Sequence, residues 1–259
     1  MNTIRLNALC ALCTLAGLAA PAYAQTADEA GVSPYRPSVS SPAQLPLAGQ
    51  LELELGGLGA KTGAVRRSSL PYTLKLAFNE QWGVLLGGEA YVVARDEAGA
   101  RAHGAGDTTV VLKRAFLVDS ATAFGLEADV KLPTAKDAIG SGKADYTLNG
   151  IVSRDIAAVH VDANVNLTRL GAYELGSSRI QRGLSASFSM PVATQWGATA
   201  ELSGTRRRGA DHTAQLLLAT TYNPSKRLAI DVGLARGLSA ATPDWSLFGG
   251  LVLPLARLW

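Results

Sequence analysis

AFGLEADVKLPTAKDAIGSGKADYTLNGIVSR, residues 123–154, alternates between apolar and polar side chains in both of its halves. In the first half Phe124 and Leu126 fall on one side, and Glu127 and Asp129 fall on the other. A segment rich in glycine and serine follows, and the alternation then resumes. A period of two indicates strands with one face in an apolar medium and one in water, so the stretch predicts a long antiparallel hairpin. A hairpin of a soluble β-sandwich alternates in the same way, and the whole chain must decide between the two.

Residues 1–24 have the features of a secretory signal peptide. Arg5 precedes an apolar run, and the small residues Ala22 and Ala24 mark a cleavage site before Gln25. The apolar run is shorter than the roughly 20 residues that a membrane-spanning helix needs. Both cysteines of the chain lie in this segment, and neither follows the small residue of a lipoprotein cleavage site. We therefore expect neither a disulfide nor a lipid anchor in the mature protein.

Residues 25–48 are rich in proline, serine and alanine and have no useful period, which predicts an extended, irregular segment. Two interpretations are open at this stage. The segment is either a disordered tether, or it folds into the lumen of a barrel or reinforces its mouth. We assign the rest of the chain, residues 49–259, to a single β-barrel.

The chain from Gln50 onward contains about twelve alternating runs. Most are ten to thirteen residues long, whereas strands of soluble proteins average about five or six and a tilted strand that crosses a bilayer needs about 9–11. The runs lie near residues 50–57, 70–79, 82–94, 106–117, 122–132, 143–153, 157–170, 179–190, 194–205, 211–222, 226–236 and 244–255.

The connections between these runs alternate between short and long. We expect the long ones near residues 58–69, 95–105, 133–142, 171–178, 206–210 and 237–243. Outer-membrane barrels have short periplasmic turns and longer extracellular loops, and a soluble sandwich has no reason to sort its loops in this way. The pattern therefore predicts an all-β protein, a transmembrane antiparallel β-barrel of about 12 strands.

The aromatic residues gather near the predicted strand ends. Phe78, Trp82 and Trp196 lie toward the short turns, and Tyr91 and Trp245 lie toward the long loops. Two aromatic belts at two water boundaries are typical of a membrane barrel. The chain ends in LVLPLARLW, and a terminal aromatic residue after alternating apolar positions resembles the signal that directs outer-membrane proteins to the barrel assembly machinery.

Several short motifs resemble the family described as "MetA-pathway of phenol degradation". They are a GxGD strand, a strand that ends in K-x-P-T, a loop with GSG and a strand with an aspartate and a serine. The matching residues are Gly104, Gly106, Asp107, Lys131, Pro133, Thr134, Gly140, Gly142, Asp145 and Ser153. The resemblance implies an outer-membrane barrel that passes small, aromatic or otherwise hydrophobic molecules. Its motifs are turn and strand signals rather than catalytic residues.

The alternation places a set of polar side chains on the inner faces of three neighbouring strands. These candidate lumen-lining residues are Glu127, Asp129, Lys131, Asp145, Asn149, His160, Asp162, Asn164 and Asn166. Glu52, Glu54, Lys75 and Glu201 are further inward candidates. Charges of both signs can line a polar channel, or they can pair with one another and fill the interior, because an unpaired buried charge is costly. A barrel of twelve strands is intermediate between barrels of about 8 strands, which side chains fill, and barrels of about 16–18 strands, which leave an open channel.

The function predicted from these features is passive passage of small molecules across the bacterial outer membrane. We expect no enzyme: His212, beside Asp211, is followed by Thr213 and not by the serine of a barrel phospholipase. A third possibility is a structural barrel whose cationic loop, Arg206 to Arg208, binds lipopolysaccharide phosphates. The net charge of +3 without a basic stripe excludes a nucleic-acid partner. We expect a monomer in outer-membrane lipid, with no metal and no cofactor.

Overall fold

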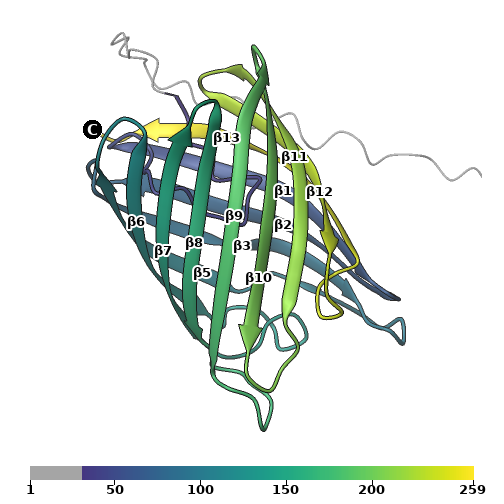
Figure 1. Ribbon diagram of the computed structural model, residues 1–259. Helices are drawn as coiled ribbons and strands as arrows, with labels where there is room; N and C mark the ends of the chain where they lie inside the picture. Colours follow the sequence, from purple (N-terminus) through teal and green to yellow (C-terminus); the bar gives the residue numbers. More distant parts are fainter. Residues whose placement is uncertain (1–30) are drawn as a thin grey trace, which may run out of the picture.

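The computed structural model describes residues 31–259, which form a closed antiparallel β-barrel of twelve long strands (Figure 1). The prediction of an all-β barrel is therefore confirmed. The strands are β1 (Gln50–Thr62), β2 (Val65–Ala77), β3 (Trp82–Arg95), β4 (Arg101–Gly104), β5 (Thr108–Leu117), β6 (Thr122–Leu132), β7 (Asp145–Ile156), β8 (Val159–Arg169), β9 (Ile180–Ala193), β10 (Trp196–Arg207), β11 (Thr213–Ser225), β12 (Leu228–Gly237) and β13 (Trp245–Arg257). The predicted signal peptide lies outside the described residues.

The barrel closes because its first and last long strands pair. β1 pairs antiparallel with β13 over most of its length, and every other long strand pairs with its neighbours in the sequence. β4 is a short strand that pairs with the last residues of β3 at one rim, and β5 pairs with the first half of β3. A closed sheet leaves no edge with unpaired backbone groups. Among residues 31–259 no helix has the length and hydropathy of a membrane span.

The two faces of the wall reverse the usual distribution of polarity. On β6 the apolar Phe124 and Leu126 are 44% and 49% exposed on the outside, whereas the charged Glu127 is only 4% exposed. On β7 Leu148 is 59% exposed and its neighbour Asn149 is 7% exposed. A soluble sandwich would bury the leucines and expose the charges. The outer surface therefore suits an apolar medium, and the polar face lies inside.

The short turns gather at one rim and the longer hairpins at the other. The carboxyl end lies at the rim with the short turns, at the top of Figure 1. Here the backbone N–H of Leu258 donates to the carbonyl of Gly49 over 2.8 Å, which ties the two ends of the barrel sequence together. The aromatic residues follow the predicted belts, since Phe78 and Trp196 are exposed near this rim and Tyr91 and Trp245 are exposed near the other.

Two of the expected long loops are wrong. The segment 58–69 is mostly strand, because β1 and β2 continue to a turn at Gly63 and Ala64, where Gly63 has a φ of +55°. The segment 95–105 contains β4. Both hairpins extend beyond the rim at the lower right of Figure 1. Polar residues on both faces of these extensions hide the period of two, although cross-strand hydrogen bonds continue through them.

Candidate functional site: the barrel lumen

The nine candidate lumen-lining residues all lie on the inward face of β6, β7 and β8. Glu127, Asn149, Asp162 and Asn164 are buried there. Cross-strand pairs such as Glu127 with Asn149, Asn149 with Asn166 and Ser153 with Asp162 show that the polar faces are in register. Glu52, Glu54, Lys75 and Glu201 are also buried on the inner wall. The alternation in the sequence did not show what this wall contacts.

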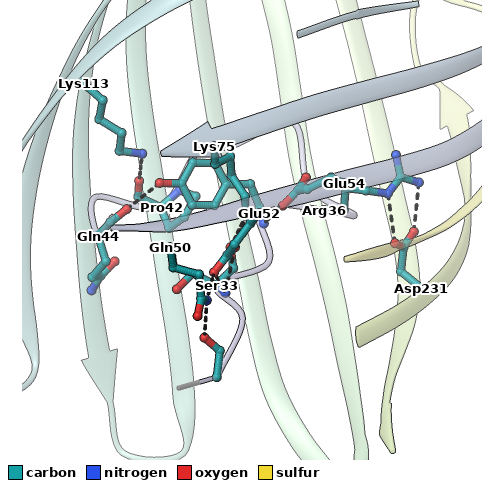
Figure 2. A network of polar contacts seen from close by, with 12 residues as sticks. Ser33, Arg36, Pro42, Gln44, Gln50, Glu52, Glu54, Lys75, Lys113 and Asp231 are labelled. Atoms are coloured by element: carbon teal, nitrogen blue, oxygen red, sulfur yellow. Dashed lines mark hydrogen bonds and ion pairs between the residues drawn. The ribbon is translucent and has the colours of Figure 1, made fainter. Parts of the chain in front are cut away.

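Much of this wall contacts residues 31–48, which we call the plug segment. The segment has no regular strand apart from one bridge of Ala48 with Ala77, and it lies inside the barrel (Figure 2). Its hydrogen bonds reach side chains of β1, β2, β5, β7, β8, β10 and β12. For residues 31–48 the second of the two interpretations of this part of the sequence holds.

Carboxylates of the wall accept hydrogen bonds from the backbone of the plug segment. Glu52 accepts from the N–H of Ser33 at 3.2 Å, and Glu54 accepts from the N–H of Tyr35 at 2.7 Å. On the far side of the lumen, Glu201 accepts from two successive N–H groups, those of Val39 and Ser40, at 2.8 and 2.9 Å. An irregular segment leaves its backbone donors unpaired, and these carboxylates satisfy them.

Arg36 joins the plug segment to the wall by a salt bridge with two hydrogen bonds. Its guanidinium donates to both carboxylate oxygens of Asp231, at 3.0 and 3.1 Å (Figure 2). Gly56 of β1 and Gly250 of β13 face each other across the strand pair. A Cβ atom on either glycine would lie 2.7 Å from the guanidinium, so the two glycines leave the space that Arg36 occupies.

Two lysines with fully buried side chains hold the middle of the segment. Lys75 pairs with Glu52 at 3.0 Å and with Glu54 at 2.7 Å, and Lys113 pairs with Glu127 at 2.9 Å. Their ammonium groups also donate to the carbonyls of Ser33 and Pro42 of the plug segment. Buried charges are stable only when they are paired and hydrogen-bonded, and here the plug segment supplies part of that pairing.

The ring of Tyr35 lies between these two lysines. The Lys75 and Lys113 ammonium groups are 4.3 and 4.2 Å from the ring centroid. The hydroxyl of Tyr35 donates to the carbonyl of Gln44 at 2.7 Å, which folds the plug segment back on itself. Desolvation by burial, followed by the nearby carboxylates, raises the pKa of Tyr35 well above its ordinary value. The tyrosine therefore stays neutral and offers its ring face to two cations.

The remaining anchors lie on β7 and β8. Asn164 exchanges two hydrogen bonds of 2.9 Å with the backbone of Ser41. The hydroxyl of Ser153 accepts from the N–H of Ala43 at 2.7 Å and donates to Asp162. Ser153 is one of the residues that carry the family resemblance, and its observed role is to position the plug segment.

Two cavities lie on either side of the plug segment. One of about 700 Å³ opens toward the short turns and is lined by Asp155, His160, Thr194 and Asn223, among others. The second, of about 440 Å³, lies toward the long loops. Its wall includes Asp129, Thr147, Asn149, Asn164, Asn166, Ser185, Ser203, Thr205, Gln215 and Thr242. Within the described residues one carboxylate oxygen of Asp129, Oδ1, is buried without a hydrogen-bond partner.

The other family-motif residues meet at the rim with the long loops. Lys131 pairs with Asp145 at 2.8 Å and with Asp107 at 3.3 Å, and Asp107 accepts from the N–H of Ala135 at 3.0 Å. Thr134 donates to Thr108 at 2.9 Å. These contacts fold the loop 133–144 back over the start of β5. Lys131 and Asp145 are therefore tied into the rim and away from the plug segment.

Glycines complete this rim cluster. A Cβ atom on Gly140 would lie 2.7 Å from the Asp107 carboxylate, and one on Gly106 would lie 2.7 Å from Glu89. Gly104 packs near Ile139, and Gly142 adopts a φ of +63°. Pro133 directly follows β6. The residues that carry the resemblance thus build a loop anchor.

Sequence reasoning missed several residues that contact the plug segment. Asp231, Lys113, Tyr35 and Arg36 were not among the candidates. A usable signal exists for Asp231, which is the only charged residue between Leu228 and Leu234 in an otherwise apolar strand. No comparable signal identified Tyr35 or Arg36, because an irregular segment has no period that assigns a face to its side chains.

The residues considered for catalysis and for lipopolysaccharide binding lie in or beside the loop between β10 and β11. His212 contributes its backbone carbonyl, which accepts from Ser239, and Thr213 bonds with Thr205. Arg207 faces inward and pairs with Glu174 at 2.7 Å, whereas Arg206 lies opposite Arg182 of β9. Within residues 31–259, no three His, Cys, Asp or Glu side chains are placed to hold a metal ion.

The loop between β8 and β9 is held against β10 by the Glu174–Arg207 pair. A hydrogen bond from its own backbone, followed by the Arg207 guanidinium, lowers the pKa of the Glu174 carboxyl. Ser177 of the same loop accepts a hydrogen bond from Arg207 at 3.1 Å. This loop therefore remains tied to the barrel rim while Glu174 is ionised.

Comparisons with known proteins show the fold of bacterial outer-membrane channels. No family model matches the sequence, and no curated protein matches it. An outer membrane channel from Pseudomonas putida F1 is similar in structure, with a TM-score of 0.64 and 12% identity over 82% of this chain and 98% of that one. The motif resemblance to the phenol-degradation family therefore stays a prediction.

Two further channels have the same architecture. The KdgM porin in complex with disordered oligogalacturonate has a TM-score of 0.52 at 10% identity, over 80% of this chain and 99% of that one. The CymD monoaromatic hydrocarbon channel has a TM-score of 0.52 at 8% identity, over 82% and 90%. At these identities the likeness extends to the fold and not to the solute.

Proposed function

We propose that the protein is an outer-membrane channel for the passive passage of small molecules, and that the plug segment occupies its lumen at rest. The observation that carries the proposal is the polar inner wall with a cavity on each side of the plug segment. A barrel with an apolar exterior needs no such wall for membrane insertion, since side chains alone can fill a small barrel. A water-accessible passage is the simplest use for it.

The lining of the second cavity favours solutes that form hydrogen bonds. Most residues of its wall carry a hydroxyl, amide or carboxylate group, and the apolar Val39, Leu184, Ala214, Ala241 and Pro243 complete it. The motif resemblance implies aromatic or hydrophobic cargo, and one structural neighbour is a monoaromatic hydrocarbon channel while another holds an oligogalacturonate. Small hydroxylated molecules such as phenolics can form hydrogen bonds with this lining and also have the aromatic character that the resemblance implies. We propose this class as the cargo.

The proposed setting is the bacterial outer membrane. The predicted signal peptide, the exposed apolar outer wall and the terminal Trp259 support it, as does the shared fold. In this setting the barrel assembly machinery inserts the protein, and it acts as a monomer in outer-membrane lipid. The rim with the short turns then faces the periplasm.

Solute flux through proteoliposomes tests the proposal. Wild-type protein and a variant without residues 31–48 are refolded, checked for heat-modifiable migration, and compared with empty vesicles for uptake of sugars, amino acids and small phenolics. We expect slow, solute-dependent flux in the wild type and faster flux in the deletion variant. If neither folded protein passes any solute, the channel proposal is wrong, and a loop-binding barrel or an enzyme replaces it.

A further inference from the structure

A row of five cations and one tryptophan crosses six strands on one side of the barrel. Each member is the direct cross-strand partner of the next, from β12 to β4. We call it the basic row, and its members are Arg236, Trp245, Lys61, Arg66, Arg95 and Arg101. The sequence does not reveal it, because its members come from separate hairpins and adjoin only through strand register.

The basic row lies on the outer face near the rim with the long loops. Residues two positions apart in a strand lie on the same face. Leu247 therefore shares the face of Trp245 and is 67% exposed, and Val93 shares the face of Arg95 and is 40% exposed. Val92, which faces inward beside Val93, is fully buried. On β3 and β13 the row thus borders the apolar band, whereas on β2 Ser68 lies between Arg66 and the exposed Leu70. Trp245 lies within the row, with the Arg236 guanidinium 4.9 Å from its ring.

The height of the row matches the outer boundary of a bilayer. β2 has 13 residues, and a strand of that length at the usual rise and tilt spans about 33 Å of height. The apolar band of an outer-membrane barrel is about 25 Å tall. Arg66 is next to the end of β2 that lies beyond this band, while Ala77 marks the opposite end. The basic row therefore reaches the level of lipid head groups.

No carboxylate of the described chain neutralises the row. Within residues 31–259 none of its five cations forms an ion pair, although Arg66 donates to the carbonyl of Gly63 and Arg236 to that of Asp244. The nearby acids are Asp96 and Glu97 in the turn before β4, and Asp244, whose carboxylate accepts from the N–H of Gly63. Like charges directly opposite each other in a sheet are destabilising, so an external anion would relieve the repulsion.

We propose that the basic row binds the phosphate groups of lipopolysaccharide in the outer leaflet. Arginine matches phosphate oxygens with a planar fork of donors, and three arginines on adjacent strands present such forks side by side. The exposed leucine and valine below the row would contact the acyl chains of the same molecule. This inference rests on the proposed outer-membrane location, but not on transport, so a protein that passes no solute can still confirm it.

Native mass spectrometry of the refolded full chain tests the proposal. Protein in lipopolysaccharide-free detergent is titrated with lipid A that carries both phosphates, and with the same lipid A after removal of its phosphates. We expect binding of the phosphorylated form only. The triple variant Arg66→Gln, Arg95→Gln, Arg101→Gln should weaken it by about tenfold or more, because three charge-assisted contacts are lost.

The control changes three cations near the opposite rim, with the substitutions Arg154→Gln, Arg227→Gln and Arg257→Gln, and should bind lipid A as the wild type does. Heat-modifiable migration confirms that each variant folds, and Arg95→Gln alone replaces the triple variant if that one does not fold. Equal binding by wild type and row variant, or equal binding of dephosphorylated lipid A, overturns the proposal. So does full displacement of lipid A by excess inorganic phosphate, which would indicate a site for the free anion.

Discussion

At the scale of single residues, Asp129 is the wall carboxylate with the greatest freedom to meet a solute. Glu127 forms an ion pair with Lys113, and Asp162 accepts a hydrogen bond from Ser153. Asp129 lines the second cavity and has one oxygen without a hydrogen-bond partner in the described chain. A carboxylate in a cavity attracts cations and accepts hydrogen bonds from hydroxyl groups. It is therefore the residue through which permeation can be altered with the least effect on the fold.

We predict that Asp129→Asn lowers the preference of the channel for cations over anions and leaves folding intact. The amide keeps the size of the side chain and removes its charge. Reversal potentials across a planar bilayer under a salt gradient measure the change. Glu80→Gln, which removes a carboxylate from a short turn outside the lumen, is the matched control. An unchanged reversal potential for Asp129→Asn would remove this residue from the solute path.

Loss of the Lys113 side chain should lower the stability of the barrel. The side chain is fully buried against Glu127, and Lys113→Met would leave that carboxylate buried without its cation. Breaking a buried ion pair on one side costs about 3–5 kcal/mol. Urea unfolding of the refolded barrel, followed by tryptophan fluorescence, measures the free energy of unfolding. The double variant Lys113→Met, Glu127→Gln should recover much of the loss, and equal stability of wild type and single variant would contradict the pairing.

At the scale of elements, the plug segment is held by polar contacts rather than by a packed core. The largest cluster of fully buried apolar residues that includes it is small, namely Ala43, Ala123 and Ile151. Polar contacts inside a water-accessible lumen exchange readily with water, because their net contributions are modest. The segment is thus suited to partial release while the barrel itself stays folded.

We predict that Arg36→Ala loosens the plug segment and increases conductance. The change removes the two hydrogen bonds to Asp231, and that carboxylate becomes free to face the lumen. Single-channel recording should show more frequent or larger openings than the wild type. Arg257→Ala, which changes a cation at the rim, serves as control. If openings are the same in Arg36→Ala and in wild type, the salt bridge does not hold the channel closed.

At the scale of the whole molecule, the described lumen wall carries more acids than bases. Its acids are Glu52, Glu54, Glu89, Glu127, Asp129, Asp145, Asp162, Glu201 and Asp231, and its bases are Arg67, Lys75, Lys113, Lys131 and Arg207. The outer surface has the opposite character near the rim with the long loops, where the basic row lies. The inner face of the sheet therefore carries an excess of acids over its whole height, and the basic row places positive charge on the outer face near the rim with the long loops.

We predict that removal of residues 31–48 makes the channel more selective for cations. The deletion removes Arg36 and uncovers the carboxylates of Glu201 and Asp231, so the lumen becomes more negative. Ion selectivity from reversal potentials, compared between the folded wild type and the folded deletion variant, measures the effect. A deletion variant that conducts but shows equal or reversed selectivity would contradict an acidic lumen.

The sequence by itself determined the barrel. Few folds accommodate strands that alternate over ten or more residues and turn their large apolar side chains outward. Leu126 and Leu148 were assigned to the outer face from this period alone, and both are exposed there. The sequence also located the turns of the rim cluster, since Gly140 and Pro133 constrain the backbone locally. Such local signals do not depend on what lies across the lumen.

Only the tertiary structure decided where residues 31–48 lie and which cations share a row. The contact between Arg36 and Asp231 joins residues far apart in the sequence, and no local period predicts it. The row from Arg236 to Arg101 arises from the register of separate hairpins, and a shift by one residue would turn its side chains inward. The periodic wall could be predicted because its signal is local. The plug segment and the row could not, because long-range register and closure of the sheet place them.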